Sequence, residues 1–399
     1  MSEQEFDVAV VGAGVFSCFS ALLLAQEGLK IGLIYPEKTE LLGSFFSSLR
    51  TCWPSLNDPP TRAEVAHGHE VALYLHEFCS KGIAYFQHSL LPLIGDNSNW
   101  ISSSCLRIST KDFETDELED AFKLGFGLKK TELKNVYLEE NNSLICKNPE
   151  EFQNTIYQAL QRNNVHLISS AAVKINETQS SCSIEFKNHP KINCEIAVLG
   201  NTLNISKLLP RYEKILIPMS DTLFEYHCKS NIAFPSISFR AANGHVCATF
   251  FSNHDDVYLK ISGPRFLLPG AGAGIDLTNS HIDEKVFQNI EKYHSEILFG
   301  IIQNYLEIKT REELLSQLPL SLVSKKILVD CYPCDELPVV GEFGKLGRIL
   351  GNTGWLATGF SAGFWAAKII KELVLNEKSV DLHSRLQPRR LFTSFVKTK

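Results

Sequence analysis

The sequence lacks the features that mark membrane, nucleic-acid-binding and zinc proteins. Among its 399 residues, no apolar run approaches the length of about 18 residues needed for a membrane span, and no run of lysines and arginines forms a basic patch. The eleven cysteines are single apart from Cys331 and Cys334, so none has the paired spacing of zinc ligands. We therefore expect no membrane, nucleic-acid or metal partner.

The remaining composition is that of an ordinary globular protein. Hydrophobic residues make up 44% of the chain, charged residues make up 21%, and the formal net charge is -6. A first strand that starts at about Phe6 leaves no room for a signal peptide, and scattered cysteines are typical of buried side chains in a reducing compartment. We expect a cytoplasmic protein, long enough for two interleaved domains.

The opening segment has the pattern of a dinucleotide-binding turn. A short β-branched run at 8–11 is typical of a buried strand, and a helix is predicted from about 15 to 27. Between them, Gly12 permits a sharp turn and Gly14 lets a pyrophosphate approach the backbone and the helix N-terminus. Ser17 replaces the third glycine of the pattern but is small enough for close packing. The expected nucleotide contacts here are Gly12, Gly14, Val15, Phe16 and Ser17.

Recognition of the ribose is the least regular part of this pattern. The second strand, Ile31 to Ile34, ends in Tyr35-Pro36-Glu37 and not directly in an acidic residue. Either Glu37 reaches the ribose hydroxyls from two residues further on, or the hydroxyl of Tyr35 replaces it.

Material of the same domain recurs later in the chain. A helix is predicted at Pro149 to Gln161, followed by a strand at Val165 to Ser169 and a nucleotide contact at Val173. A further buried strand ends at Gly200 and Asn201, where ligands bind in a parallel sheet. The segments between are β-rich and aromatic, which predicts an antiparallel domain.

The predicted fold class is therefore α/β, with a Rossmann-like domain interleaved with an antiparallel-sheet α+β substrate domain. The predicted nucleotide-binding domain comprises 1–81, 147–217 and 323–399, and the substrate domain comprises 82–146 and 218–322.

Four separated motifs carry a family resemblance. They are the opening turn, GSFFSSLRTCW at 43–53, LKISG at 259–263, and CYPCDELPVVGEFG at 331–344 followed by GFSAGF at 359–364. Together they resemble the FAD-dependent D-amino-acid oxidase superfamily, and within it the branch of monomeric sarcosine oxidase. The resemblance runs from the first strand to about Leu373 and is weak between Ile83 and Ser143.

The resemblance implies roles for several residues. Arg50 would stabilise the anionic reduced flavin, and Lys260 would favour reaction with O2 by its positive charge. The helix that begins near Gly359 would direct its N-terminus at the flavin pyrimidine. The further flavin contacts that the resemblance implies are Ser44, Ser47, Ser48, Phe360, Ser361, Gly363 and Phe364. Cys331 is the nearest candidate for a covalent flavin link, which this branch often has, and Cys334 is a more distant one.

The implied substrate pocket departs from the family pattern. Relatives that oxidise small amino acids grip the carboxylate with an arginine and a lysine, and this chain has Trp53 and Trp365 at those places. Either Arg240 or Arg265 replaces these cations, or the substrate is larger and more apolar and contacts the indole rings. Tyr258 is a further pocket candidate, and His245 and His254 are candidate bases that hydride transfer does not require.

The resemblance therefore implies oxidation of a secondary or cyclic amine, or of an amino-acid derivative, to an imine, with O2 as acceptor. Two alternatives stay open: a hydroxy-acid or amino-acid dehydrogenase with another acceptor, and a flavin-fold protein that binds without catalysis. The oligomeric state does not follow from the sequence.

Overall fold

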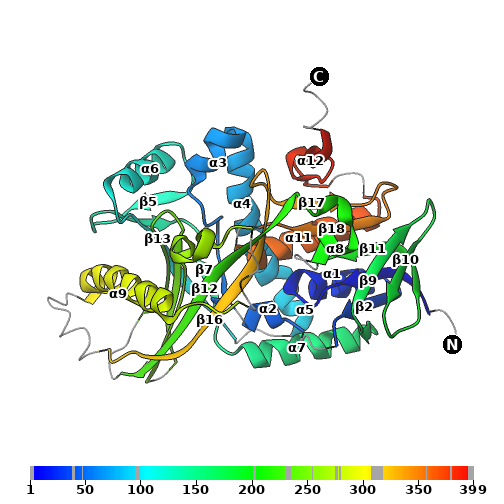
Figure 1. Cartoon of the computed structure of the whole chain (residues 1–399), viewed down its shortest axis with the longest axis horizontal. Helices are drawn as coiled ribbons and strands as arrows, with labels where there is room; N and C mark the ends of the chain where they lie inside the picture. The colour runs from blue at the N-terminus through cyan, green and yellow to red at the C-terminus, as the bar shows by residue number, and fades with distance from the viewer. Residues whose placement is uncertain are drawn as a thin grey trace.

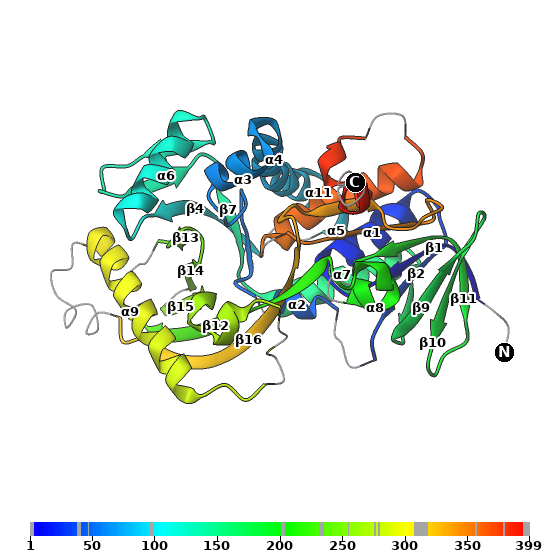
Figure 2. The ribbon, with the colours of Figure 1, turned by 45° about the horizontal axis from the view of Figure 1, so that its top comes forward.

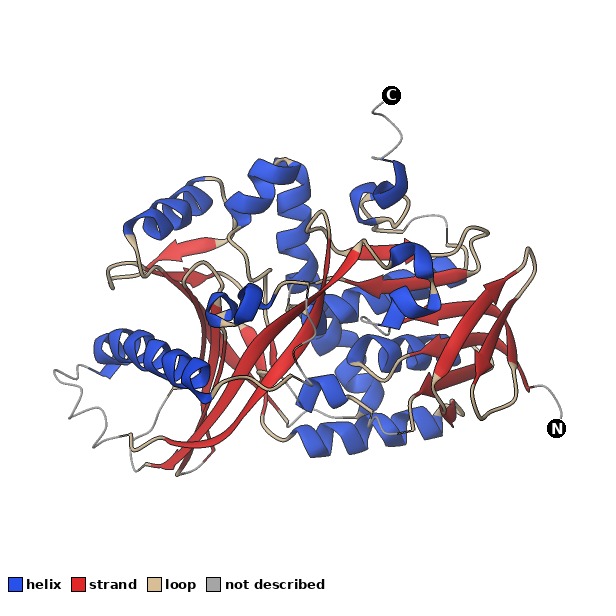
Figure 3. Cartoon of the chain, viewed as in Figure 1, coloured by secondary structure: helices blue, strands red, loops and turns tan. Residues whose placement is uncertain are grey.

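The computed structural model contains two large sheets with helices packed around them (Figure 1, Figure 3). It describes residues 4–37, 41–46, 48–95, 99–200, 204–230, 235–253, 255–274, 277, 280–306, 318–355, 357–377 and 380–393. No helix within these ranges is long and apolar enough to cross a membrane.

The first sheet is parallel at its centre. Its order is β17-β18-β11-β1-β2-β8, with β1 parallel to both β2 and β11, and with β10 and β9 joined to β11 as an antiparallel extension. The strands are β1 (Gln4–Val11), β2 (Ile31–Tyr35), β8 (His166–Ser169), β9 (Ala172–Glu177), β10 (Cys182–Phe186), β11 (Ile192–Leu199), β17 (Val339–Glu342) and β18 (Ile349–Thr353).

Three helices pack together beside this sheet. In α1 (Val15–Gln26) every residue from 15 to 24 is buried, as expected for a helix that is apolar all round. It contacts α11 (Gly359–Val374), where a Cβ at Gly363 would touch Phe16. A side chain at Gly82 of α4 (His69–Tyr85) would clash with the Ser361 carbonyl oxygen of α11, so this glycine allows the close approach.

The other helices are short or lie at the periphery (Figure 1). They are α2 (Gly43–Phe46), α3 (Pro60–His67), α5 (Leu91–Ile94), α6 (Asp112–Lys123), α7 (Pro149–Arg162), α8 (Ile205–Leu208), α9 (Glu284–Leu306) and α12 (Arg390–Thr393), with a π turn at Phe86–Leu90 and 3₁₀ turns at Pro210–Tyr212, Arg265–Leu267, Pro269–Gly272 and Ser384–Leu386.

The second sheet is antiparallel except where β13 runs parallel to β4. Its order is β16-β12-β15-β14-β13-β4-β6-β5, with β3 and β7 joined at β4. The strands are β3 (Thr51–Cys52), β4 (Trp100–Ile108), β5 (Leu128–Lys130), β6 (Val136–Glu139), β7 (Ser143–Cys146), β12 (Leu216–Lys229), β13 (Ile237–Ala241), β14 (Val246–Asn253), β15 (Asp256–Ser262) and β16 (Ser321–Pro333).

The architecture confirms the predicted fold class. The long strands β12 and β16 extend from the second sheet toward the first, and Figure 2 shows them between α9 and the helices of the parallel-sheet region. One face of β12, β15 and β16 therefore lies where a ligand bound at the parallel sheet would meet it. The predicted domain boundaries stay a prediction.

Candidate active site

The glycine turn after β1 has the tight backbone that the sequence predicts. Gly12 has φ 138°, which favours glycine, and its N–H donates to the Ile34 carbonyl oxygen at 2.8 Å. A Cβ at Gly200 would clash with Phe16 and with the Ser17 hydroxyl, which is fully buried. Ser17 therefore fills the space between the turn and the end of β11. It packs there, and it does not line the adjacent cavity.

Two helix N-termini open into one cavity of about 490 Å³. The caps of α1 and α11, Gly14 and Thr358, provide no side-chain hydrogen bond, and neither first turn carries an acid. Free N–H groups and both helix dipoles therefore favour an anionic ligand. The cavity lining includes Gly14, Val15, Phe16, Ser48, Gly200, Asp221, Ser262, Lys326, Leu328, Asp330, Trp355, Gly359 and Phe360.

A second hollow of about 250 Å³ lies at the carboxyl ends of β1 and β2. Tyr35, Pro36 and Val173 line it, together with Lys207. Two hollows flanking a glycine turn fit an elongated dinucleotide, with the pyrophosphate at α1 between them. Glu37 is exposed and lies outside this lining, whereas Tyr35 is part of it, and the choice between them for the ribose stays a prediction.

Arg50 stands in a strained backbone next to this cavity. Its φ is 57°, in the left-handed region that non-glycine residues rarely adopt. Its N–H donates to the Ser48 hydroxyl at 3.1 Å, and its buried Nε has no hydrogen-bond partner among the described residues. A buried guanidinium nitrogen without a partner is a donor available to a ligand. Ser47 and Asn201 lie outside the described residues, as does the side chain of Ser44.

Lys260 lies beside Ser48 and Arg50. It is buried, its Nζ donates to the Ser48 carbonyl oxygen at 3.3 Å, and it forms an ion pair with Glu225. Burial and the nearby Arg50 charge lower the pKa of Lys260 to about 8, against the opposing effect of Glu225. The ammonium is not in the cavity lining but contacts Ser48, which is, and its pKa of about 8 places its change of charge near neutral pH.

The two tryptophans lie outside the cavity. Trp53 is buried in a small apolar cluster, with the Arg240 guanidinium 4.6 Å from its ring centroid. Trp365 packs on Tyr85 of α4 and under Lys368, since it lies five positions after Phe360 in α11 and therefore on another face of the helix. Neither indole is in the cavity lining, and the substrate contacts through them stay a prediction.

Arg240 is also unavailable to a ligand. It is buried and donates to Oε1 of Glu139, at 2.7 Å, and to Ser55, while Arg107 donates to the same Glu139 oxygen at 2.9 Å. Burial alone would raise the pKa of Glu139, but the two guanidinium groups lower it to about 2. The Nε of Arg240 has no partner among the described residues, but Arg240 is absent from the cavity lining and its terminal nitrogens donate within this cluster.

Other candidates from the sequence contribute packing. Ser361 donates to the Thr358 carbonyl oxygen, and Phe364 stacks on Phe86 with ring centroids 4.1 Å apart. Tyr258 stacks on Phe251, and the ring of His245 meets Phe266. Tyr258 and His245 are absent from the cavity lining, and His254 lies outside the described residues.

Cys331 is absent from the cavity lining, whereas the five residues before it in β16, 326–330, are part of it. Burial and Asp330 raise the pKa of the Cys331 thiol to about 12, which disfavours the reactive thiolate. Cys334 is exposed beyond the end of β16. Neither thiol is placed for a covalent link in this geometry.

The sequence reading missed three charged residues that line the cavity: Asp221, Lys326 and Asp330. Two of them, Lys326 and Asp330, belong to the segment KILVD at 326–330, and all five residues of this segment line the cavity. Register places Asp221 of β12 opposite Leu328, and Leu223 opposite Lys326. The three side chains thus share one face of the β12–β16 pair.

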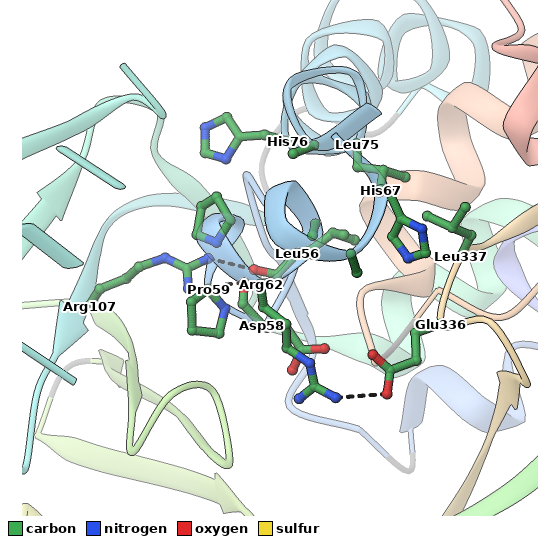
Figure 4. Close-up of a pocket in the computed structure, with 14 residues that line it drawn as sticks. Leu56, Asp58, Pro59, Arg62, His67, Leu75, His76, Arg107, Glu336 and Leu337 are labelled. Carbon is green, nitrogen blue, oxygen red and sulfur yellow. Dashed lines mark hydrogen bonds and ion pairs between the residues drawn. The ribbon is translucent and has the colours of Figure 1, made fainter. Parts of the chain in front are cut away.

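A smaller hollow lies between the segment at 56–60, α3 and α4 (Figure 4). Its volume is about 30 Å³, room for roughly one water. Arg62 points across its edge to Glu336, at 2.7 Å. It lies among packing residues and not at the two helix N-termini, so it is not the ligand cavity.

Comparison with known proteins agrees with this geometry. The family described as FAD dependent oxidoreductase matches residues 7–373. No curated protein matches the sequence significantly. Similar solved structures include glycine oxidase from Geobacillus kaustophilus, with TM-score 0.69 and 13% identity over 96% of this chain and 98% of that one.

Two further similar structures extend the comparison. L-proline dehydrogenase from P. horikoshii has TM-score 0.70 and 11% identity over 98% of this chain and 99% of that one. L-amino acid deaminase from Proteus myxofaciens, in complex with anthranilate, has TM-score 0.67 and 16% identity over 98% and 94%. At these identities the likeness concerns the fold alone.

Proposed function

Because the chain belongs to the family of FAD-dependent oxidoreductases, we propose that it oxidises a secondary or cyclic amine, or an amino-acid derivative, to an imine with O2 as acceptor. The observation that carries the proposal is a cavity into which two helix N-termini open and whose lining includes Ser48. Arg50 and Lys260 are not in the lining themselves, but both are hydrogen-bonded to Ser48. The similar structures named for glycine oxidase and L-proline dehydrogenase support oxidation at a carbon next to nitrogen.

The residues present fit FAD. The N–H groups at Gly14 and Val15 would hold the pyrophosphate, and Tyr35 with Val173 would border the adenosine end. The N-terminus of α11 would face the other end of the cofactor, beside the unpaired Nε of Arg50. We propose that FAD is bound without a covalent link, since Cys331 lies outside the cavity lining.

When bound, FAD supplies the acceptor for the hydride that leaves the substrate carbon. The chain's own residues orient the amine and manage charge. Arg50 and the two helix N-termini stabilise negative charge in the cavity, and they act without the reorganisation that water would need. Lys260 places a second positive charge beside Ser48 of the cavity lining, where it would favour electron transfer to O2.

The same arrangement argues against a small amino acid gripped by its carboxylate in the family's manner. Trp53 and Trp365 stand where the family has cations, and both lie outside the cavity lining. Arg240 forms an ion pair with Glu139. A carboxylate buried without a cation costs several kcal/mol.

We further propose a cytoplasmic location, and a division into a nucleotide-binding domain (1–81, 147–217, 323–399) and a substrate domain (82–146, 218–322).

The test is the visible spectrum of the purified protein before and after acid precipitation. Flavin bands that pass into the supernatant would support noncovalent FAD, whereas colour in the pellet would point to a link through Cys331 or Cys334. Colourless protein that cannot be reconstituted with FAD would refute the proposal and favour a binding protein without catalysis.

One observation favours a second candidate, a dehydrogenase that uses another acceptor. The carboxylate of Glu225 pairs with Lys260 and compensates its charge. Anaerobic reduction by substrate followed by admission of air separates the two. Rapid reoxidation by air supports the oxidase, and slow reoxidation by air with rapid reoxidation by a quinone or dye supports the dehydrogenase.

A further inference from the structure

The wall formed by β12 and β16 presents charge to the ligand cavity. Asp221 lies opposite Leu328, and Lys326 lies opposite Leu223, so Asp221 and Lys326 are diagonal neighbours on one face. Such neighbours have Cα atoms about 7–8 Å apart. Both side chains, with that of Asp330, line the cavity. The wall therefore presents two carboxyl groups, of Asp221 and Asp330, and the amino group of Lys326 to the place where an amine substrate would lie.

The two acids have different surroundings. Asp330 uses both oxygens within the protein: it accepts the N–H of Cys331 at 2.7 Å and the N–H of Ala357 at 2.7 Å. Ala357 immediately precedes the first turn of α11 and has φ 66°. Asp330 therefore fixes the loop that leads into this helix. Each carboxylate oxygen of Asp330 thus already accepts a backbone N–H group.

Asp221 has an oxygen to spare. Its Oδ1 accepts the N–H of Thr222 at 2.7 Å, and its Oδ2 has no hydrogen-bond or ion-pair partner among the described residues. The Arg265 guanidinium acts on it through space but lies over the ring of Tyr332, 5.0 Å from the centroid. A carboxylate oxygen that borders a cavity without a donor requires one from a ligand or from water.

Burial raises the pKa of Asp221 to about 7, against the Thr222 N–H and the Arg265 charge, which lower it. Asp330 raises it further. The carboxylate is thus costly to maintain when nothing pairs with it. A cationic ligand would remove that cost.

We propose that Asp221 is the subsite for the cationic nitrogen of the substrate, so that this protein selects its substrate by an ammonium–carboxylate pair and needs no carboxylate on the substrate. The inference rests on the proposed function, because it names how the amine of that reaction is held: the substrate binds as an ammonium, gives one proton to the Asp221 carboxylate, and is then the neutral amine from which the hydride can leave. An ammonium supplies N–H donors that match the free Oδ2. The aromatic rings of Trp355 and Phe360 in the same lining suit a cation and an apolar substituent.

The probes are three molecules of nearly the same shape: tert-butylamine, tert-butanol and pivalate. None has a hydrogen on the carbon next to the polar group, so the amine cannot be oxidised to an imine. Titration calorimetry with the purified, FAD-supplemented protein at pH 8 measures their affinities whether or not turnover occurs. Asp221→Asn keeps the acceptor for the Thr222 N–H, and Asp221→Ser is a second variant of smaller size.

The wild-type protein should bind the amine at least about tenfold more tightly than the alcohol, as expected for a hydrogen bond to a charged group. Both Asp221 variants should abolish this preference, and it should also decline as the pH falls below about 7. Lys326→Met is the matched control on the same wall. The Lys326→Met protein should still bind the amine more tightly than the alcohol, and only its affinity for pivalate should be lower than in the wild-type protein.

Equal binding of the amine and the alcohol by the wild-type protein, or a preference that persists in both Asp221 variants, overturns the inference. Selective amine binding through Asp221 in a protein that oxidises no amine would support the subsite and refute the proposed oxidation. Oxidation of amines by a protein that binds the amine and the alcohol equally well would support the proposed oxidation and refute the Asp221 subsite.

Discussion

Replacing Asp221 by asparagine should stabilise the folded protein at pH 8. The pKa of this carboxyl is raised by burial from 3.8 to about 7, so the folded state favours its protonated form. A raised pKa contributes stability that is present below the unfolded value and is lost as the pH rises through the folded value. Above pH 7 the wild-type protein therefore maintains a carboxylate at a cost that asparagine does not have.

The size of the effect follows from the two pKa values. The difference between about 7 and 3.8, at about 1.4 kcal/mol for each pH unit, sets an upper limit of about 4 kcal/mol. Asp221 borders an open cavity and is only half-buried, so solvent screening reduces this gain. We expect about 1–2 kcal/mol at pH 8. The gain should fall between pH 7 and pH 4 and vanish below about pH 4.

The measurement is the free energy of unfolding by urea at pH 8 and at pH 4.5, with FAD held at one saturating concentration. Asp330→Asn is the matched control, because both oxygens of Asp330 accept backbone N–H groups and asparagine would lose one acceptor. It should destabilise the protein or leave it unchanged. An Asp221→Asn protein that is less stable than wild type at pH 8 would refute the reasoning. A gain that does not depend on pH would refute it equally.

Three further changes probe the cofactor site and its supports. Lys260→Met should slow reoxidation of the reduced flavin by O2 at least about tenfold in stopped-flow measurements. In the wild-type protein this reoxidation rate should fall with a midpoint near pH 8 as Lys260 loses its proton, and Glu225→Gln should shift the midpoint to lower pH, because Glu225 raises the pKa of Lys260. Glu139→Gln should lower the free energy of unfolding by about 3–5 kcal/mol, because it leaves two buried guanidinium groups without their carboxylate. Gly200→Ala should weaken FAD binding in equilibrium titrations, because its Cβ would clash with the Ser17 hydroxyl.

The nucleotide side of the site was predictable because its signals are local. The expected helices at 15–27 and 149–161 form as α1 and α7, within one residue at each end. Gly12 is required by a turn that no other residue adopts easily, and its neighbours in sequence are its neighbours in space. The strand ending at Gly200 also forms, because an apolar run and a small residue fix it without tertiary information.

The substrate side was not predictable in the same way, because it depends on which face of an element each residue occupies. Trp365 follows Gly359 by six residues, and a shift of one residue in where α11 begins rotates every later side chain by about 100°. Cys331 and Asp330 exchange faces under a shift of one residue in β16. The motifs occur in the expected order along the chain, but their order does not determine which side chains face the cavity.

The charges of the cavity connect these two outcomes. The turn, both helix N-termini, Arg50 and Lys260 all place positive potential on the cofactor side, and this much follows from the family motifs. A substrate cation facing only positive groups would be repelled, and a substrate carboxylate finds neither of the expected cations. The free oxygen of Asp221 lies on β12, the strand that also pairs with the Lys260 strand β15, and it adds a negative charge to the cavity lining. If Asp221 holds the substrate nitrogen as we propose, the absence of the carboxylate clamp and the presence of this carboxylate have one explanation: recognition of the cationic group of the substrate in place of the anionic one.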